Sequence, residues 1–194
     1  MRAGVQAIDE ELAECARRGS GLAFGALVER HGDRVYWIAR NLCDTAAEAE
    51  EVTRQTFLSA YQGIALRDPG SSFQAWLSRI AVETALALRQ ARPRPAGSLE
   101  SLLPRFDEMG HLTAPPSEWP ELDRMEVTGV LREALGCMED AVRAAFVLCD
   151  LAELPAEEAA GILQTSTAVI QQRVHRARLM LRGFLDQLWI RTAN

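Results

Sequence analysis

Apolar residues recur at intervals of three and four along most of the chain, the spacing that predicts amphipathic helices. The clearest stripe lies between residues 167 and 188 and is formed by Ile170, Val174, Ala177, Leu181, Leu185 and Leu188. A shorter helical pattern precedes it and begins after Pro155, a residue that suits the start of a helix. Gln164, Thr165 and Ser166 interrupt the periodicity between the two patterns. Because serine and threonine are good N-caps, this interruption predicts a tight turn between two helices.

The outward face of the second of these helices is small, polar and basic. Its residues point away from the stripe or flank it at about 100° per residue, and they are Ala168, Gln171, Gln172, Arg173, His175, Arg176, Arg178 and Arg182. A helix-turn-helix presents such a face to the major groove of DNA. The pattern alone is weak, so an ordinary helical hairpin with a solvated polar face stays about equally open.

The first half of the chain predicts a small bundle of helices. Helical patterns run from about residue 22 to 42, from 45 to 61, and from 71 to 92. The second pattern opens with a capping box formed by Thr45 and Glu48, and the third with a capping box formed by Ser71 and Gln74. Short connections favour antiparallel packing of these helices. His31 lies on the apolar face of the first helix, where we expect a core residue rather than a ligand.

Composition divides the chain into two helical domains. Residues 93–125 hold six of the eight prolines, with glycine, serine and acidic residues between them, which predicts an extended linker. Helical patterns resume at about 126–138 and 139–150 and lead into the helix-turn-helix. No strand candidate is found. The prediction is therefore an all-α protein with one small domain at 1–92 and another at 126–194.

Charge and cysteine content narrow the classes of function. The net charge of −6 is unfavourable for unaided binding to DNA, although four of the 21 basic residues fall between 173 and 182. No apolar run could span a membrane and no signal peptide opens the sequence, so we expect a cytoplasmic protein without membrane insertion. The four cysteines lack metal or disulfide spacing and are expected to be buried thiols. No nucleophile–base pair, phosphate loop, metal site or cofactor motif appears, so no enzyme is expected.

Two stretches of the chain resemble the bacterial extracytoplasmic-function (ECF, group IV) sigma factors, the smallest sigma subunits of RNA polymerase. Sigma region 2 is similar to FGALVERHGDRVYWIARNLCDTAAEAEEVTRQTFLSAY followed by FQAWLSRIAVETAL. Sigma region 4 is similar to MEDAVRAAFVLCDLAELPAEEAAGILQTSTAVIQQRVHRARLMLRGFL. The two stretches lie in the family's order, with a linker between the two regions.

The resemblance implies three binding surfaces. The helix at 45–61 would dock on a coiled coil of the largest subunit of core RNA polymerase, and its candidate residues are Glu50, Glu51, Arg54, Gln55, Phe57 and Tyr61. The helix that begins near residue 73 would capture the −10 promoter element, and its candidates are Phe73, Trp76, Arg79, Glu83 and Arg89. The helix-turn-helix would read the −35 element, and its candidates are Thr167, Gln171, Gln172, Arg173, His175, Arg176 and Arg178. The periodicity of Phe73 and Trp76 also fits burial in the core.

The chain departs from the family pattern at several positions. Glu83 is an acid where the family often has asparagine, and Gln164 stands where a glycine is usual. Residues 168–172 read AVIQQ where GTVKS is common, and the basic residues after position 88 are dispersed. The leading hypothesis is a divergent sigma factor that directs core polymerase to promoter DNA and assists initiation, with an anti-sigma factor as a further partner. The alternative is a sigma-like interaction module that binds an anti-sigma factor or polymerase without reading DNA.

Overall fold

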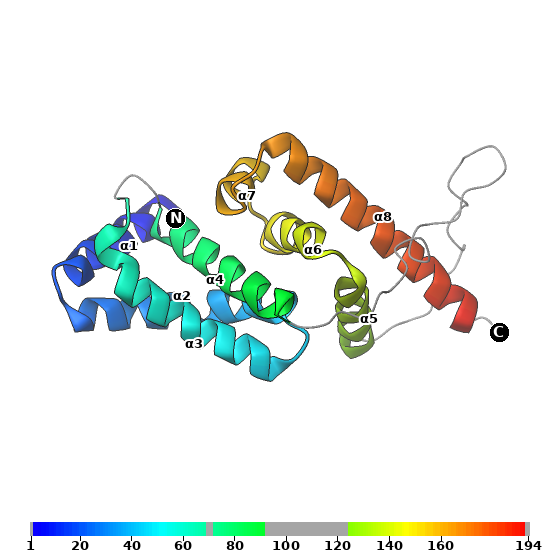
Figure 1. Cartoon of the computed structure of the whole chain (residues 1–194), viewed down its shortest axis with the longest axis horizontal. Helices are drawn as coiled ribbons and strands as arrows, with labels where there is room; N and C mark the ends of the chain where they lie inside the picture. The colour runs from blue at the N-terminus through cyan, green and yellow to red at the C-terminus, as the bar shows by residue number, and fades with distance from the viewer. Residues whose placement is uncertain (1, 69–71, 92–123, 193–194) are drawn as a thin grey trace.

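The computed structural model describes residues 2–68, 72–91 and 124–192, and within them every regular element is a helix (Figure 1). The front module consists of α1 (Arg2–Arg17), α2 (Gly21–Leu42), α3 (Ala46–Gly63), the short η1 (Ile64–Leu66) and α4 (Phe73–Gln90). The rear module consists of α5 (Arg124–Cys137), α6 (Asp140–Phe146), the π-helical turn η3 (Val147–Leu151), α7 (Ala156–Ile162) and α8 (Thr167–Thr192). The all-α prediction is confirmed. The predicted linker lies outside the described residues except for its last two, which begin α5.

The front module packs α2, α3 and α4 around a shared apolar core that includes Leu27, Ile38 and Leu77. The predicted capping box of α3 is confirmed, because Glu48 N donates to Thr45 Oγ1 while Thr45 N donates to Glu48 Oε2. Ser71, the predicted N-cap of the next helix, lies outside the described residues. The helix α4 begins at Phe73, and the backbone N–H of Phe73 donates to Glu10 Oε1 of α1 at 2.7 Å. A carboxylate from another helix therefore occupies the position expected for a local cap.

The rear module confirms the predicted pair of helices at 156–162 and 167–192. The predicted stripe on α8 is buried at Ile170, Val174 and Ala177 and continues through Met180, while Leu181 is only half-buried. Helix α8 packs on α6 and α7 and also contacts α5, while Gln171, Gln172, His175 and Arg178 on its other side are exposed. In the turn before α8, Gln164 adopts a positive φ of 49°, in the left-handed region that favours glycine.

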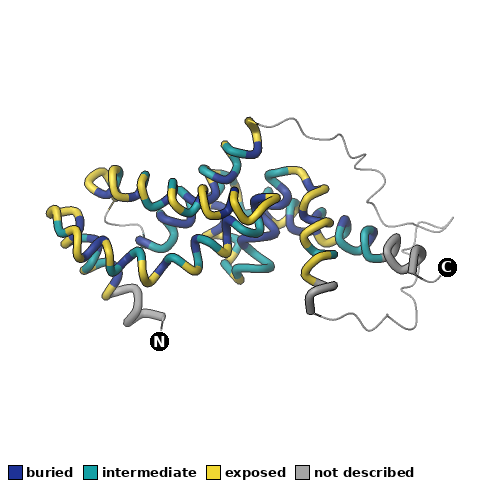
Figure 2. Tube along the Cα trace, turned by 90° about the horizontal axis from the view of Figure 1, so that it is seen from below, coloured by how far each residue is buried: buried dark blue, intermediate teal, exposed yellow. Residues whose placement is uncertain are grey.

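The two modules pack against each other and share one hydrophobic core. Buried residues of α6 and η3, among them Ala144, Ala145 and Leu148, belong to the same cluster as the core of α2, α3 and α4. Helix α7 also contacts α4. Figure 2 shows buried segments of both modules in the middle of the molecule, where they meet. A second, smaller cluster lies between α5, α6 and α8.

The cysteines are free, and the prediction that all are buried is wrong for two of them. Cys15 and Cys137 are exposed, whereas Cys43 is buried and Cys149 is half-buried. Burial raises the pKa of the Cys43 and Cys149 thiols. Over the described parts of the chain, every helix is too short or too polar to cross a membrane.

Candidate functional site

The candidate −35 residues lie together at the start of α8, on the face that the rear module leaves open. Gln171, Gln172 and His175 are exposed, whereas Thr167, Arg173 and Arg176 are half-buried. Ser166 Oγ accepts a hydrogen bond from Val169 N at 3.3 Å, so a side chain caps the first turn as the sequence predicted. The face is polar and carries amide, imidazole and guanidinium groups, which are the donors and acceptors that base edges and phosphates require.

Two arginines of this face pair with acidic residues of the same module. Arg178 donates to both carboxylate oxygens of Asp150 at 2.6 and 2.8 Å, and this pairing raises its pKa. Arg176 contacts Glu139 more loosely, at 3.4 and 3.5 Å. The side chain of Arg178 nevertheless stays 65% exposed. Because an exposed ion pair contributes little free energy, both guanidinium groups remain able to exchange their carboxylate for a phosphate.

The candidate polymerase residues lie on the outer side of α3. Glu50, Glu51, Arg54 and Tyr61 are exposed, and Gln55 and Phe57 are half-buried. Arg54 Nε donates to Glu51 Oε2 at 2.9 Å, and this hydrogen bond lowers the pKa of Glu51. The sequence interpretation missed Leu58, a large apolar side chain that is exposed one turn before Tyr61. Its position opposite the buried stripe of α3 was the signal that could have identified it.

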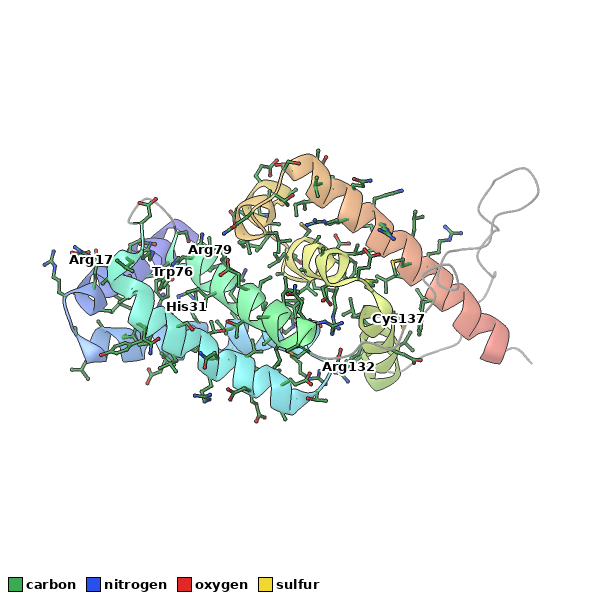
Figure 3. The ribbon with its side chains drawn as sticks, viewed as in Figure 1. Arg17, His31, Trp76, Arg79, Arg132 and Cys137 are labelled. Carbon is green, nitrogen blue, oxygen red and sulfur yellow. The ribbon has the colours of Figure 1, made fainter. Side chains whose placement is uncertain are left out.

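The candidate −10 residues differ in their exposure along α4. Trp76 and Arg79 are half-buried neighbours (Figure 3) that line a groove of about 950 Å³. Glu83 is exposed and lies 3.9 Å from Arg79. Phe73 is fully buried, with its ring centroid 5.7 Å from that of Trp76, as the burial alternative allowed.

Arg89, the remaining −10 candidate, is buried in the contact between the modules. Its Nε donates to Asp140 Oδ1 at 2.7 Å and its Nη1 donates to Asp44 Oδ1 at 2.6 Å. The pKa of Arg89 is raised, because these two carboxylates outweigh the opposing effect of burial. The structure therefore keeps Arg89 apart from Trp76 and Arg79.

His31 is a core residue, as the sequence predicted. It is buried beside the ring of Phe73, and its Nε2 lies 3.0 Å from Asp9 Oδ2. Burial lowers the pKa of His31 despite the nearby carboxylate, so at neutral pH the imidazole is uncharged. Among the residues that the structure describes, no group of His, Cys, Asp or Glu is arranged to hold a metal ion.

Comparison with known proteins agrees with this architecture. Residues 27–94 match the family model for sigma-70 region 2, and residues 128–181 match the model for sigma-70 region 4. The ECF RNA polymerase sigma factor SigE of Mycolicibacterium smegmatis is 32% identical over 172 residues, which are 87% of this chain and 63% of SigE. The chain thus spans a little under two thirds of that relative's length.

Other relatives match along nearly their full length. The RNA polymerase sigma factor CnrH of Cupriavidus metallidurans is 29% identical over 186 residues, covering 92% of this chain and 94% of CnrH. The structure of CnrH in complex with the cytosolic domain of CnrY matches with a TM-score of 0.69 at 27% identity, over 93% of this chain and 98% of that one. The sigma factor RpoE of Bartonella quintana shares the fold, with a TM-score of 0.61 at 22% identity over 84% of this chain and 96% of that one. Two matching regions in the family's order, these relatives and the shared fold show that this chain belongs to the ECF sigma factors, the sigma-70 proteins that direct RNA polymerase to promoters.

Proposed function

We propose that this sigma factor reads the −35 promoter element with the open face of α8. The observation that carries the proposal is the exposure of Gln171, Gln172 and His175 on one face at the start of α8, with Arg173 and Arg176 beside them. Glutamine can pair with adenine through two hydrogen bonds, and arginine with guanine or phosphate. In this assignment Gln172 and Arg176 contact bases, and His175 and Arg178 lie nearer to phosphates.

Region 2 supplies the other two surfaces of the proposal. Trp76 and Arg79 are half-buried neighbours on α4, and an indole ring with an adjacent guanidinium is suited to holding an unstacked base of the −10 element. The outer side of α3 binds core polymerase through Glu50, Glu51 and Arg54, with Leu58 and Tyr61 as apolar anchors. Phe73 supports Trp76 from the core rather than touching DNA.

The proposal extends to partners, location and chemistry. The CnrH structure contains the cytosolic domain of CnrY, and RpoE was solved with the anti-sigma factor NepR. On this analogy, the protein binds an anti-sigma factor of its own. It acts in the cytoplasm on core polymerase and promoter DNA, without catalytic activity and without a cofactor. The division into domains at 1–92 and 126–194 stays a prediction.

The test is run-off transcription with core RNA polymerase on the promoter of the protein's own operon. Arg176→Ala and Gln172→Ala should each weaken promoter recognition by about 1–3 kcal/mol, as loss of one good base contact does. Arg132→Ala is the matched control, because Arg132 is an exposed arginine on α5 of the same module (Figure 3). Absence of any transcript together with absence of binding to core enzyme would overturn the proposal.

A second candidate function is a sigma-like interaction module that binds its partners without reading DNA. The observation that favours it is Glu83, an exposed acid beside Arg79 on the helix proposed to face the −10 element. This candidate requires partner binding that is insensitive to Gln172→Ala and Arg176→Ala. It also requires that Glu83→Asn leaves transcription unchanged, whereas a functional sigma factor should gain activity when an acid facing DNA is removed.

A further inference from the structure

The contact between the two modules contains two buried arginines and the two aspartates that they bind, which we call the interdomain latch: Arg89, Arg143, Asp44 and Asp140. Asp44 Oδ1 accepts hydrogen bonds from Arg89 Nη1 at 2.6 Å and from Arg143 Nη1 at 3.1 Å. Asp140 Oδ1 accepts a hydrogen bond from Arg89 Nε at 2.7 Å. Arg89 and Asp44 belong to the front module, and Arg143 and Asp140 to the rear module. Each module thus contributes one arginine and one aspartate to the cluster.

The two arginines also satisfy backbone carbonyl groups at the end of α2. Arg143 donates from Nε to Asn41 O at 2.7 Å and from Nη2 to Cys43 O at 3.0 Å, and Arg89 Nη1 lies 3.2 Å from Leu42 O. The last carbonyl groups of a helix have no partner within the helix and attract positive charge. Arg143 is only 1% exposed, although it comes from the other module. Separation of the modules would therefore return two buried guanidinium groups and these carbonyl groups to water.

In this cluster, burial and the attraction between opposite charges shift the pKa values in opposite directions. Burial and the nearby charge of Arg89 lower the pKa of Arg143 to about 10, so Arg143 stays protonated at neutral pH. Burial would raise the pKa of Asp44, but the hydrogen bond from Arg143 and the charge of Arg89 outweigh it and lower the pKa. The free energy needed to remove two charges from water offsets much of the attraction within a buried ion pair. When one partner is lost, the remaining buried charge is strongly unfavourable. A contact of this kind can hold two modules together and still be opened by a competing partner.

In the closed arrangement, the rear module borders the surface that is proposed to hold the −10 element. Trp76 and Arg79 of α4 line the same groove as Pro155 and Glu158 of the rear module. Helix α8 begins only five positions after Ile162, which lines the same groove. The names of the −35 and −10 elements place them about 25 base pairs apart, which is roughly 85 Å of duplex at about 3.4 Å per base pair. The two modules therefore have to separate before they can occupy both elements.

We infer that the contact between the modules is an autoinhibited closed state held by the interdomain latch, and that core polymerase binds the open state. This inference rests on the proposed function of the two modules. Asp44 connects the latch to polymerase binding, because it directly precedes Thr45, the N-cap of α3, and its side chain is 59% exposed. A ligand that binds only the open state shifts the population toward it, and its apparent affinity is reduced by the fraction that stays closed.

The test compares Asp140→Asn with a matched control, Glu157→Gln, in the full chain. Both variants remove an acid from the first turn of a short helix in the rear module, but only Asp140 binds Arg89. Asp140→Asn should increase the radius of gyration in small-angle X-ray scattering and reduce amide protection at residues 144–148. It should also bind purified core RNA polymerase about tenfold more tightly, because a hydrogen bond between charged groups is worth a factor of that size in the closed–open equilibrium. Glu157→Gln should match the wild type in all three measurements.

A second variant keeps the test decisive if Asp140→Asn folds poorly. Asp44→Asn removes the negative charge that Arg89 and Arg143 share, and circular dichroism verifies the helix content of both variants. Wild-type radius and amide protection in both folded variants would overturn the latch. Expansion of the chain without a gain in polymerase affinity would overturn autoinhibition. If neither the wild type nor the variants bind core enzyme, the proposed function fails, whereas an expanded Asp140→Asn would still support the latch.

Discussion

Arg176 and Arg178 on α8 and Arg89 and Arg143 at the contact between the modules all pair with acidic residues, yet the two sets lie in opposite environments. The arginines of α8 remain partly exposed, and each faces one surface carboxylate. Arg89 and Arg143 are 6% and 1% exposed and are surrounded by carboxylates and carbonyl groups. Water screens the first set, so its ion pairs are weak and can be replaced by DNA phosphates. Removing a partner from the second set leaves an uncompensated buried charge.

Burial therefore determines which contacts an arginine of this chain makes. In a sigma factor, basic side chains are first expected to contact DNA, and Arg89 was placed in the −10 site on that basis. The structure instead ties Arg89 to the other module. If Arg89 exchanged Asp140 for DNA, separation of the two modules would be coupled to DNA binding at the −10 surface.

The two sets of arginines should differ most in how much they contribute to the free energy of unfolding. Arg143→Ala should lower the free energy of unfolding of the full chain by about 2–4 kcal/mol, because it removes three cross-module hydrogen bonds and leaves Asp44 and two carbonyl groups short of donors. Arg178→Ala should change the free energy of unfolding far less, since the ion pair of Arg178 is exposed. Urea denaturation of both variants measures the difference. Equal losses in the two variants would contradict the distinction between them.

In DNA binding the order of the two variants should be reversed, with the larger effect in Arg178→Ala. Arg178→Ala should reduce the slope of log affinity against log salt concentration for a −35 duplex by about 1, as loss of one phosphate contact does. Arg143→Ala should leave this slope unchanged, because Arg143 is buried. Fluorescence anisotropy at several salt concentrations provides the measurement. A reduced slope for Arg143→Ala would place Arg143 on the DNA-binding surface after all.

Much of the fold could be predicted because it depends on local patterns. The capping box of α3 and the stripe of α8 from Ile170 to Ala177 need only residues within a few turns of one another. The burial of Arg89 depends on Asp44 and Asp140, which lie 45 and 51 positions away in the sequence. The cap of α4 comes from Glu10, 63 positions before Phe73. Periodicity carries no information about such distant partners, so the sequence predicted helices well and their polar contacts poorly.

A smaller effect concerns the turn that positions α8. Gln164 has a φ of 49°, which is unfavourable for residues with a Cβ atom and acceptable for glycine. Gln164→Gly should therefore raise the free energy of unfolding by up to about 1 kcal/mol, the strain being partly offset by the greater freedom of glycine in the unfolded chain. Gln164→Ala is the control and should give no such gain. Thermal unfolding distinguishes the variants, and equal melting temperatures would show that the turn is unstrained.

The smallest difference is expected between two histidines, one buried and one exposed. His31 is buried beside Asp9, Arg30 and Arg34, whereas His175 is exposed on α8. Burial holds the pKa of His31 below its ordinary value of 6.5, so the unfolded chain binds a proton there before the folded chain does. Stability is therefore complete above pH 6.5 and declines as the pH falls toward the pKa of the folded state. In His31→Gln, the melting temperature should fall less as the pH is lowered from about 7.5 to 5.5, the range in which unperturbed histidine titrates. His175→Gln should leave the loss as it is, and an unchanged loss in His31→Gln would show that some other group causes it.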